Sequence, residues 1–67
     1  MSSNIQYLLY VDNLPTKAIH NTLSETQASA RYYQEEKKPL MITTVNSPNP
    51  VQTWNFDYTL KIWIEKK

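Results

Sequence analysis

The chain has 67 residues with no cysteine, no glycine and one histidine, and its net charge at pH 7 is +1. This length predicts a single domain over residues 1–67. The composition excludes disulfides, thiolate metal sites and glycine-rich phosphate loops, and we expect neither a metal nor a cofactor. The small net charge gives neither the strong positive field of a typical nucleic-acid binder nor the acidity of a DNA mimic.

A first strand is predicted over residues 5–11, where aromatic and branched apolar residues follow one another. Alternation along this strand places Leu8 and Tyr10 on the face opposite its larger apolar set. The strand ends at a cluster of turn formers over residues 12–15. Residues 16–23 are compatible with either a short helical turn or a loop.

The main helix is predicted over residues 25–36. Ser24, followed three residues later by Gln27, fits a capping box at its start, and a proline follows shortly after its end. Its apolar residues fall on two stripes, so the pattern leaves open whether Tyr32 or Tyr33 points inward.

A second strand is predicted over residues 40–45, followed by a loop with two prolines over residues 46–50. From Trp54 to Ile64 every even position is apolar, which predicts one long strand with a single buried face. On this prediction Trp63, at an odd position, lies on the opposite face.

These elements predict an α+β fold in which strand, helix, strand and strand follow one another. The last two strands form an antiparallel hairpin, and the longest and most apolar strand belongs in the centre. We therefore predict a two-layer domain in which a three-stranded antiparallel sheet of order 1-3-2 carries one helix on one face. The other face of this sheet is predicted to be open.

The sequence shows no recognisable arrangement of side chains for general acid–base or covalent catalysis, so we expect no enzymatic activity. There is no cysteine nucleophile, and His20 lies in a polar stretch where a solvated histidine is the ordinary interpretation. Asp57 and Lys61 share the polar face of the predicted last strand. This spacing favours an ion pair across that face rather than a general acid.

The open face of the predicted sheet carries Leu8, Tyr10 and Trp63, an apolar patch of the kind that marks partner sites. We expect Trp63 and Tyr10 to be aromatic anchors for a protein partner, with contacts from the helix as secondary ones. The alternative is that these groups only cover one another in a small protein that cannot bury every apolar side chain. The predicted protein-binding residues are Leu8, Tyr10, Tyr33, Lys37, Lys38 and Trp63.

The helix offers a second candidate surface, because aromatic side chains interleaved with cations can stack bases and neutralise phosphates. The residues of this alternative, nucleic-acid-binding surface are Arg31, Tyr32, Tyr33, Lys37 and Lys38. Tyrosines on a helix are more often part of the core or its rim, and acidic residues interrupt the basic edge. Nucleic acid is therefore not expected as the primary partner.

The order of strand, helix, strand and strand, with a polar-capped helix and an aromatic last strand, resembles that of some small phage-encoded anti-CRISPR proteins. The likeness covers most of the chain in the arrangement of its elements and involves no specific motif. It implies a stoichiometric inhibitor without catalytic chemistry that blocks a host interference complex sterically.

We therefore expect a small protein-binding module, an inhibitor of phage or mobile-element type, that occludes a site on a larger protein or ribonucleoprotein complex. The alternatives are a small nucleic-acid-binding protein and a structural subunit of an assembly. Free sheet edges also allow pairing with a partner's sheet or with a second copy as a homodimer. The sequence shows no apolar run of membrane-spanning length and no secretory signal, so we expect no membrane partner and a cytoplasmic location, in the host cell if phage-encoded.

Overall fold

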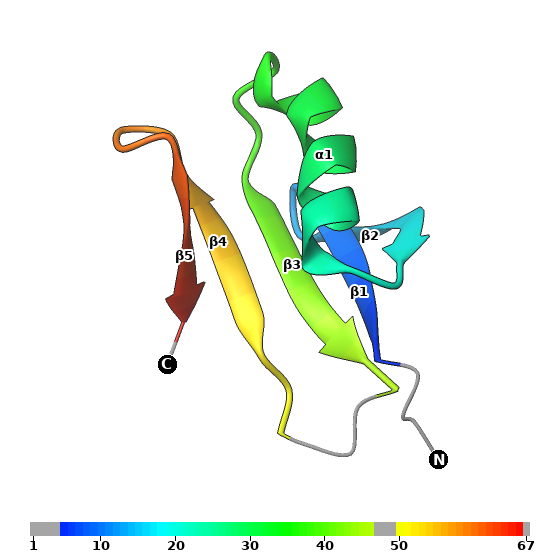
Figure 1. Ribbon diagram of the computed structural model, residues 1–67. Helices are drawn as coiled ribbons and strands as arrows, with labels where there is room; N and C mark the ends of the chain where they lie inside the picture. Colours follow the sequence, from blue (N-terminus) through cyan, green and yellow to red (C-terminus); the bar gives the residue numbers. More distant parts are fainter. Residues whose placement is uncertain (1–4, 47–49, 67) are drawn as a thin grey trace.

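The computed structural model describes residues 5–46 and 50–66, which form one sheet and one helix (Figure 1). The elements are β1 (Gln6–Val11), β2 (Leu14–His20), α1 (Leu23–Gln34), β3 (Leu40–Val45), β4 (Thr53–Asp57) and β5 (Ile62–Lys66). The sheet is five-stranded with the order β2-β1-β3-β4-β5, and every neighbouring pair is antiparallel. The predicted α+β character is confirmed. The predicted three-stranded sheet of order 1-3-2 is wrong, because two further strands take part.

One of these further strands is β2. It includes residues 16–20 of the segment 16–23, for which the sequence allowed either a helical turn or a loop. Asp12 and Asn13 connect β1 to β2 in a tight turn with φ of 56° and 64°. Positive φ at both positions matches the twist of a hairpin, and aspartate and asparagine tolerate it. Pro15 is compatible with β2 because this strand lies at an edge of the sheet, where one side needs no ladder partner.

The helix begins before the predicted start, since its N-cap is Thr22 rather than Ser24. The Thr22 hydroxyl accepts a hydrogen bond from the Glu25 N–H at 3.2 Å and donates one to the Glu25 carboxylate at 2.9 Å. Threonine followed three residues later by glutamate is therefore the capping pair of this helix. It also places a carboxylate in the first turn, where the helix dipole favours an anion.

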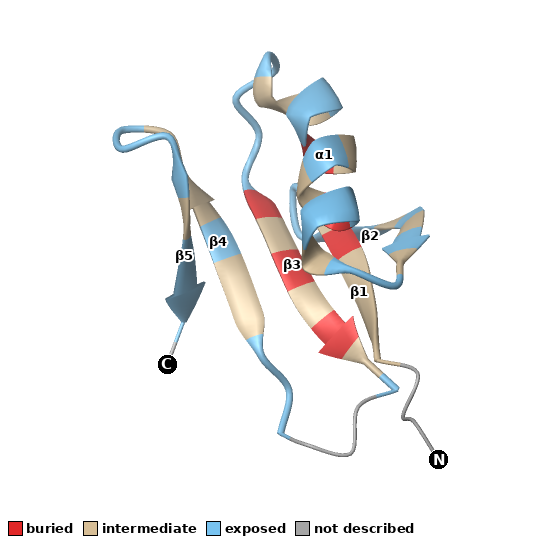
Figure 2. Ribbon diagram, viewed as in Figure 1, coloured by how far each residue is buried: buried red, intermediate tan, exposed pale blue. Residues whose placement is uncertain are grey.

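The helix packs over β2, β1 and β3, and β4 and β5 lie beyond its reach (Figure 1). The core between these layers consists of Leu9 and Val11 of β1, Leu40 and Ile42 of β3, and Ala30 of α1. Figure 2 shows the buried residues on β1, β3 and the helix, whereas β4 and β5 are half-buried or exposed. One half of the sheet face therefore has a helix on it, and the other half does not.

The predicted long strand over residues 54–64 is two strands, β4 and β5, joined by a turn. Phe56 pairs with Trp63 across this hairpin. Residues directly opposite each other in an antiparallel ladder point to the same face, so Trp63 lies on the helix side of the sheet beside Phe56. Ile62 and Ile64 point to the other face and are 51% and 42% exposed. The expected burial of these two isoleucines with Phe56 is therefore wrong.

Ile42→Ala tests where the core lies. Ile42 is fully buried, and truncation of a buried isoleucine costs about 2–5 kcal/mol of unfolding free energy because it leaves a cavity. We expect a loss in this range by urea denaturation followed by circular dichroism. Ile62→Ala removes the same atoms from an exposed side chain and should cost less than about 1 kcal/mol. Equal losses in the two variants would contradict the facing of β5.

Candidate functional site

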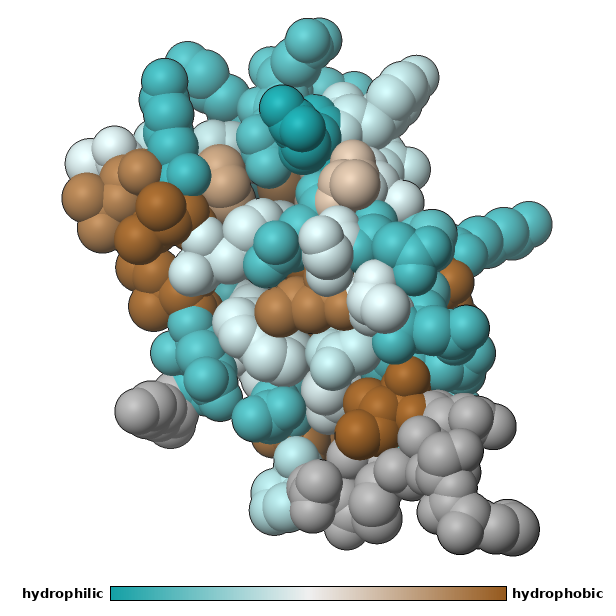
Figure 3. Space-filling model, viewed as in Figure 1, coloured by the Kyte–Doolittle hydropathy of each residue, from teal (hydrophilic) through white to brown (hydrophobic). Residues whose placement is uncertain are grey.

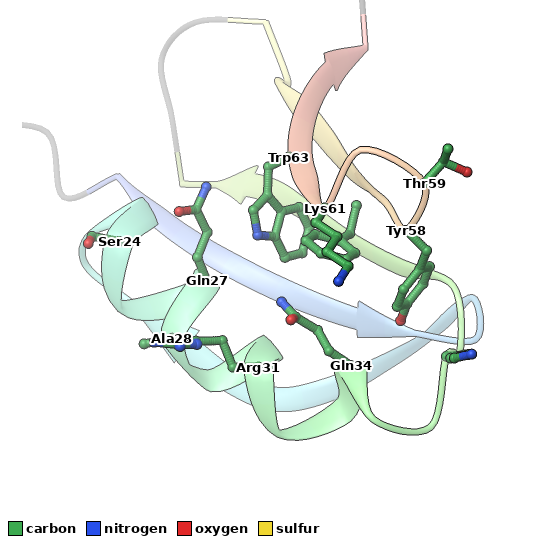
Figure 4. A pocket seen from close by; sticks show the side chains of 11 residues that line it. Ser24, Gln27, Ala28, Arg31, Gln34, Tyr58, Thr59, Lys61 and Trp63 are labelled. Carbon is green, nitrogen blue, oxygen red and sulfur yellow. The ribbon is translucent and has the colours of Figure 1, made fainter.

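A groove lies between α1 and the β4–β5 hairpin, on the half of the sheet face that the helix leaves open. Its volume is about 890 Å³. The helix supplies one wall, the hairpin supplies the floor, and the hairpin turn bounds one end (Figure 4). The lining residues are Ser24, Gln27, Ala28, Arg31, Gln34, Lys37, Phe56, Tyr58, Thr59, Lys61 and Trp63.

Aromatic rings form the floor of the groove. The Phe56 ring contacts the Trp63 ring at a centroid distance of 5.3 Å and an interplanar angle of 64°. It also contacts the Tyr58 ring at 4.9 Å and 81°. These edge-to-face contacts hold the rings in defined orientations while each ring stays only half-buried. A ligand can therefore bury an apolar or aromatic side chain against them.

The wall of the groove is a polar stripe of α1. Its residues, at spacings of three and four along the helix, are Ser24, Gln27, Ala28, Arg31 and Gln34. The buried residues Thr26 and Ala30 lie on another side of the helix, toward the sheet. In Figure 4, Gln27 and Gln34 extend from the helix toward the ring of Trp63. Each glutamine amide offers both donors and an acceptor to a bound molecule.

Three cationic side chains, Arg31, Lys37 and Lys61, line the groove, and none of its described lining residues is acidic. The ion pair found within residues 5–46 and 50–66 joins Lys38 to Glu36 at 3.2 Å and lies outside the groove. The groove is thus locally positive although the net charge of the chain is only +1. A concave, locally positive site raises the local concentration of anionic ligands.

Left-handed backbone positions two of these cations. Lys37 follows the helix with φ of 54°, and Lys61 ends the hairpin turn with φ of 58°. The Lys37 N–H donates to the Gln34 carbonyl at 3.0 Å, and the Lys61 N–H donates to the Asp57 carbonyl at 2.6 Å. These backbone hydrogen bonds fix the positions from which both side chains reach the groove.

Asp57 shapes the hairpin turn and does not form the predicted ion pair with Lys61. Its carboxylate accepts hydrogen bonds from the N–H groups of Thr59 at 2.8 Å and Leu60 at 3.0 Å. An aspartate that binds its own following N–H groups stabilises a turn without glycine. The prediction is wrong because it assumed one continuous strand, whereas Lys61 belongs to the turn.

Tyr58 ties the two sides of the groove together at the end bounded by the hairpin turn. Its hydroxyl donates a hydrogen bond to the Lys38 carbonyl, in the segment that follows α1. Desolvation by burial raises the pKa of Tyr58 above its ordinary value of 10.0. The phenol therefore keeps its proton, and with it this hydrogen bond, throughout the neutral pH range.

The structure separates the predicted protein-binding residues. Leu8 and Tyr10 point away from the helix, whereas Trp63 lies on the helix side, so these three do not form one patch. The reason is the hairpin turn, which reverses the alternation along the last part of the chain. Lys37 lines the groove together with Trp63, and Lys38 lies outside it.

The two helix tyrosines have different environments. Tyr33 packs against the hydrophobic core, and Tyr32 is 80% exposed and meets the Tyr33 ring edge-on at 5.4 Å. Neither ring is part of the groove that Arg31 and Lys37 line. The alternative nucleic-acid surface is therefore split between the groove and another side of the helix.

His20 lies outside the groove and joins β2 to α1. Its Nε2 atom is 2.8 Å from the Ser29 hydroxyl oxygen, and the contact is half-buried. This histidine is less solvated than predicted, because β2 brings it against the helix.

Sequence reasoning missed much of the groove. Phe56 is predicted as a core residue, Gln27 as a capping residue and Lys61 as half of an ion pair, yet all three line the groove. The signal for the wall is present in the sequence, as polar residues at helical spacing. The floor depends on which residues pair across the hairpin, and the alternating pattern alone does not locate its turn.

Within residues 5–46 and 50–66, no three His, Asp or Glu side chains gather closely enough to hold a metal ion. In the same part of the chain, the one helix is too short and too polar to cross a membrane. No protein-family model, no curated protein and no solved structure matches the chain. Function is therefore inferred from the chemistry of the groove residues.

Tyr58→Phe tests the contact that ties the groove together. The variant loses the hydrogen bond to the Lys38 carbonyl, so we expect the free energy of unfolding to fall by about 0.5–1.5 kcal/mol in urea denaturation. Tyr32→Phe removes the same hydroxyl from an exposed ring and should change it by less than about 0.5 kcal/mol. A Tyr58→Phe variant as stable as the wild type would show that this hydrogen bond contributes nothing to stability.

Proposed function

We propose that this chain is a small non-catalytic protein-binding module whose groove holds an acidic, extended segment of a partner protein. The observation that carries the proposal is one groove that combines an aromatic floor with three cations and has no acidic residue among its described lining. The rings can bury an apolar side chain of the segment, and the cations can bind carboxylates on either side of it.

The helix wall supports a peptide as the ligand. An extended peptide carries N–H and C=O groups along both edges, and each must find a partner when the peptide is bound. The amides of Gln27 and Gln34 provide donors and acceptors at two points along α1. The helix has 12 residues and is about 18 Å long, which matches roughly five extended residues at about 3.4 Å each.

The mechanism that we propose is occlusion, without a chemical step. A domain that binds an acidic segment of a larger protein or ribonucleoprotein complex also covers the surface around that segment. This mode of action is the one implied by the resemblance to phage-encoded anti-CRISPR inhibitors. Affinity then depends on aromatic anchors such as Trp63, whose truncation typically costs about 2 kcal/mol or more in a protein interface.

A single-stranded nucleic acid is the second candidate ligand. It is favoured by one observation, that Arg31 and Lys37 line the groove beside rings on which bases can stack. The charge of the chain as a whole argues for the protein ligand, because the net charge is only +1 and three of the seven basic residues line the groove. A nucleic acid needs a longer track of cations along its phosphates.

Arg31→Glu tests the acidic-segment proposal. We expect a displayed library of random peptides, panned on the wild-type protein, to yield sequences with carboxylates around an aliphatic or aromatic residue. The affinity of a synthesised hit, titrated by tryptophan fluorescence, should fall at least about tenfold in Arg31→Glu, because a charge-assisted contact is replaced by repulsion. Circular dichroism checks that the variant is folded.

Lys17→Glu is the matched control, since it makes the same charge change on the exposed face of β2, outside the groove. It should leave peptide affinity within about twofold of the wild type. Selection of peptides without carboxylates, or equal losses in the two variants, would refute the proposal. Binding of a thymidine oligonucleotide that weakens steeply with salt and is lost in Arg31→Glu would favour the second candidate.

A further inference from the structure

The two edges of the sheet differ in how well they are protected. β2, at one edge, contains Pro15 and pairs with β1 through an irregular register, and both features hinder pairing with another strand. β5, at the other edge, pairs with β4 in a continuous register and contains no proline. Within the described part of the chain, no strand pairs with its outer side. Such an edge is a template for another strand.

We propose that β5 pairs with β5 of a second copy of this chain, antiparallel and centred on Trp63. In this register Trp63 is opposite Trp63 of the second copy and Ile62 is opposite Ile64, and Lys61, the turn residue directly before β5, lies next to Glu65. The two five-stranded sheets then form one continuous sheet of ten strands. The proposal rests on the sheet edge and does not depend on the ligand proposed for the groove.

Exposed apolar side chains on β5 support this pairing. Ile62 and Ile64 are about half exposed and point to the face of the sheet away from the helix. In the proposed ladder, these isoleucines from both copies lie side by side in one cluster and are removed from water. Figure 3 shows hydrophobic side chains over the hairpin at the left of the view, on the side of the molecule where β5 lies.

Charge complementarity selects this register. A ladder centred on Trp63 brings Lys61, the turn residue directly before β5, next to Glu65 at each end, and both side chains are exposed and on the face that carries the groove. A ladder centred one residue further, on Ile64, sets a lysine against an isoleucine instead. A ladder centred on Glu65 sets two carboxylates opposite each other. Opposite charges across a ladder stabilise it and like charges destabilise it.

The pairing also joins the grooves of the two copies, and it sets Glu65 of the second copy beside Lys61 at the edge of each groove. A two-fold axis perpendicular to the sheet leaves both helices on the same face. The two grooves then meet across the paired Trp63 rings, so that the aromatic floor runs from Phe56 of one copy to Phe56 of the other. Each copy supplies the far side of the groove that β5 leaves open in a single chain.

Charge reversal tests the register. Sedimentation equilibrium over a concentration series into the millimolar range should show a monomer–dimer equilibrium for the wild type. Lys61→Glu or Glu65→Lys alone should raise the dimer dissociation constant roughly tenfold, because each sets like charges opposite each other at both ends. The double variant Lys61→Glu/Glu65→Lys restores both pairs and should dimerise like the wild type. Lys66→Glu, on the same strand but on the opposite face, is the matched control and should have little effect.

Cross-linking tests the same register directly, because the chain has no cysteine of its own. A mixture of Ile62→Cys and Ile64→Cys chains should form disulfide-linked dimers faster under mild oxidation than either variant alone. Both substitutions are at exposed positions and leave the core intact.

Three results would overturn the proposal. The first is a wild type that stays monomeric throughout the concentration series. The second is a dimer dissociation constant that is the same in both single charge variants as in the wild type. The third is faster cross-linking of Ile64→Cys with itself than with Ile62→Cys. The peptide-binding proposal fails separately, since Arg31 belongs to the helix wall and takes no part in the proposed ladder. Arg31→Glu should therefore leave the dimer intact.

Discussion

A single helix is too narrow to cover this sheet, and much of the structure follows from that mismatch. Five strands span about 19 Å at about 4.8 Å between neighbours, whereas a helix with its side chains is about 10 Å across. The helix therefore covers β2, β1 and β3, where the core lies. On the remaining strands, Trp54, Phe56 and Trp63 cover the face by packing on other rings. Because no second layer closes over them in the described part of the chain, these rings stay accessible, and the groove results.

The parts of the fold that local pattern determines could be predicted from the sequence. β1 and β3 are runs of apolar and branched residues, and the helix is marked by polar capping residues before it and a proline after it, all of which are local signals. β2 escaped prediction because Pro15 and the polar residues around it are typical of a loop, and only its edge position makes them compatible with a strand. The β4–β5 hairpin escaped prediction because apolar residues continue at even positions through its turn. Which face Trp63 occupies depends on its pairing with Phe56, and pairing is not a local property.

The candidate site shows the same division. Arg31, Lys37 and Trp63 were each predicted as candidate binding residues from their type, but not as members of one groove. Their place in one groove depends on the helix stripe and the hairpin lying opposite each other, which are far apart in the sequence. The helix residues that line the groove could have been identified from their spacing alone. The floor required the position of a turn that Asp57 stabilises without any glycine.

Because the chain has no glycine, other residues adopt the left-handed backbone conformation, and this affects both folding stability and the charge of the groove. Among residues 5–46 and 50–66, five adopt positive φ, and three of them, Asp12, Asn13 and Asn46, are of the types that tolerate it. The other two are Lys37 and Lys61, for which the left-handed conformation costs about 1–2 kcal/mol each. Glycine at either position would relieve that cost and remove a groove cation. The chain therefore gives up folding stability at the same two positions that bring positive charge to the groove, a compromise often found at strained residues in functional sites.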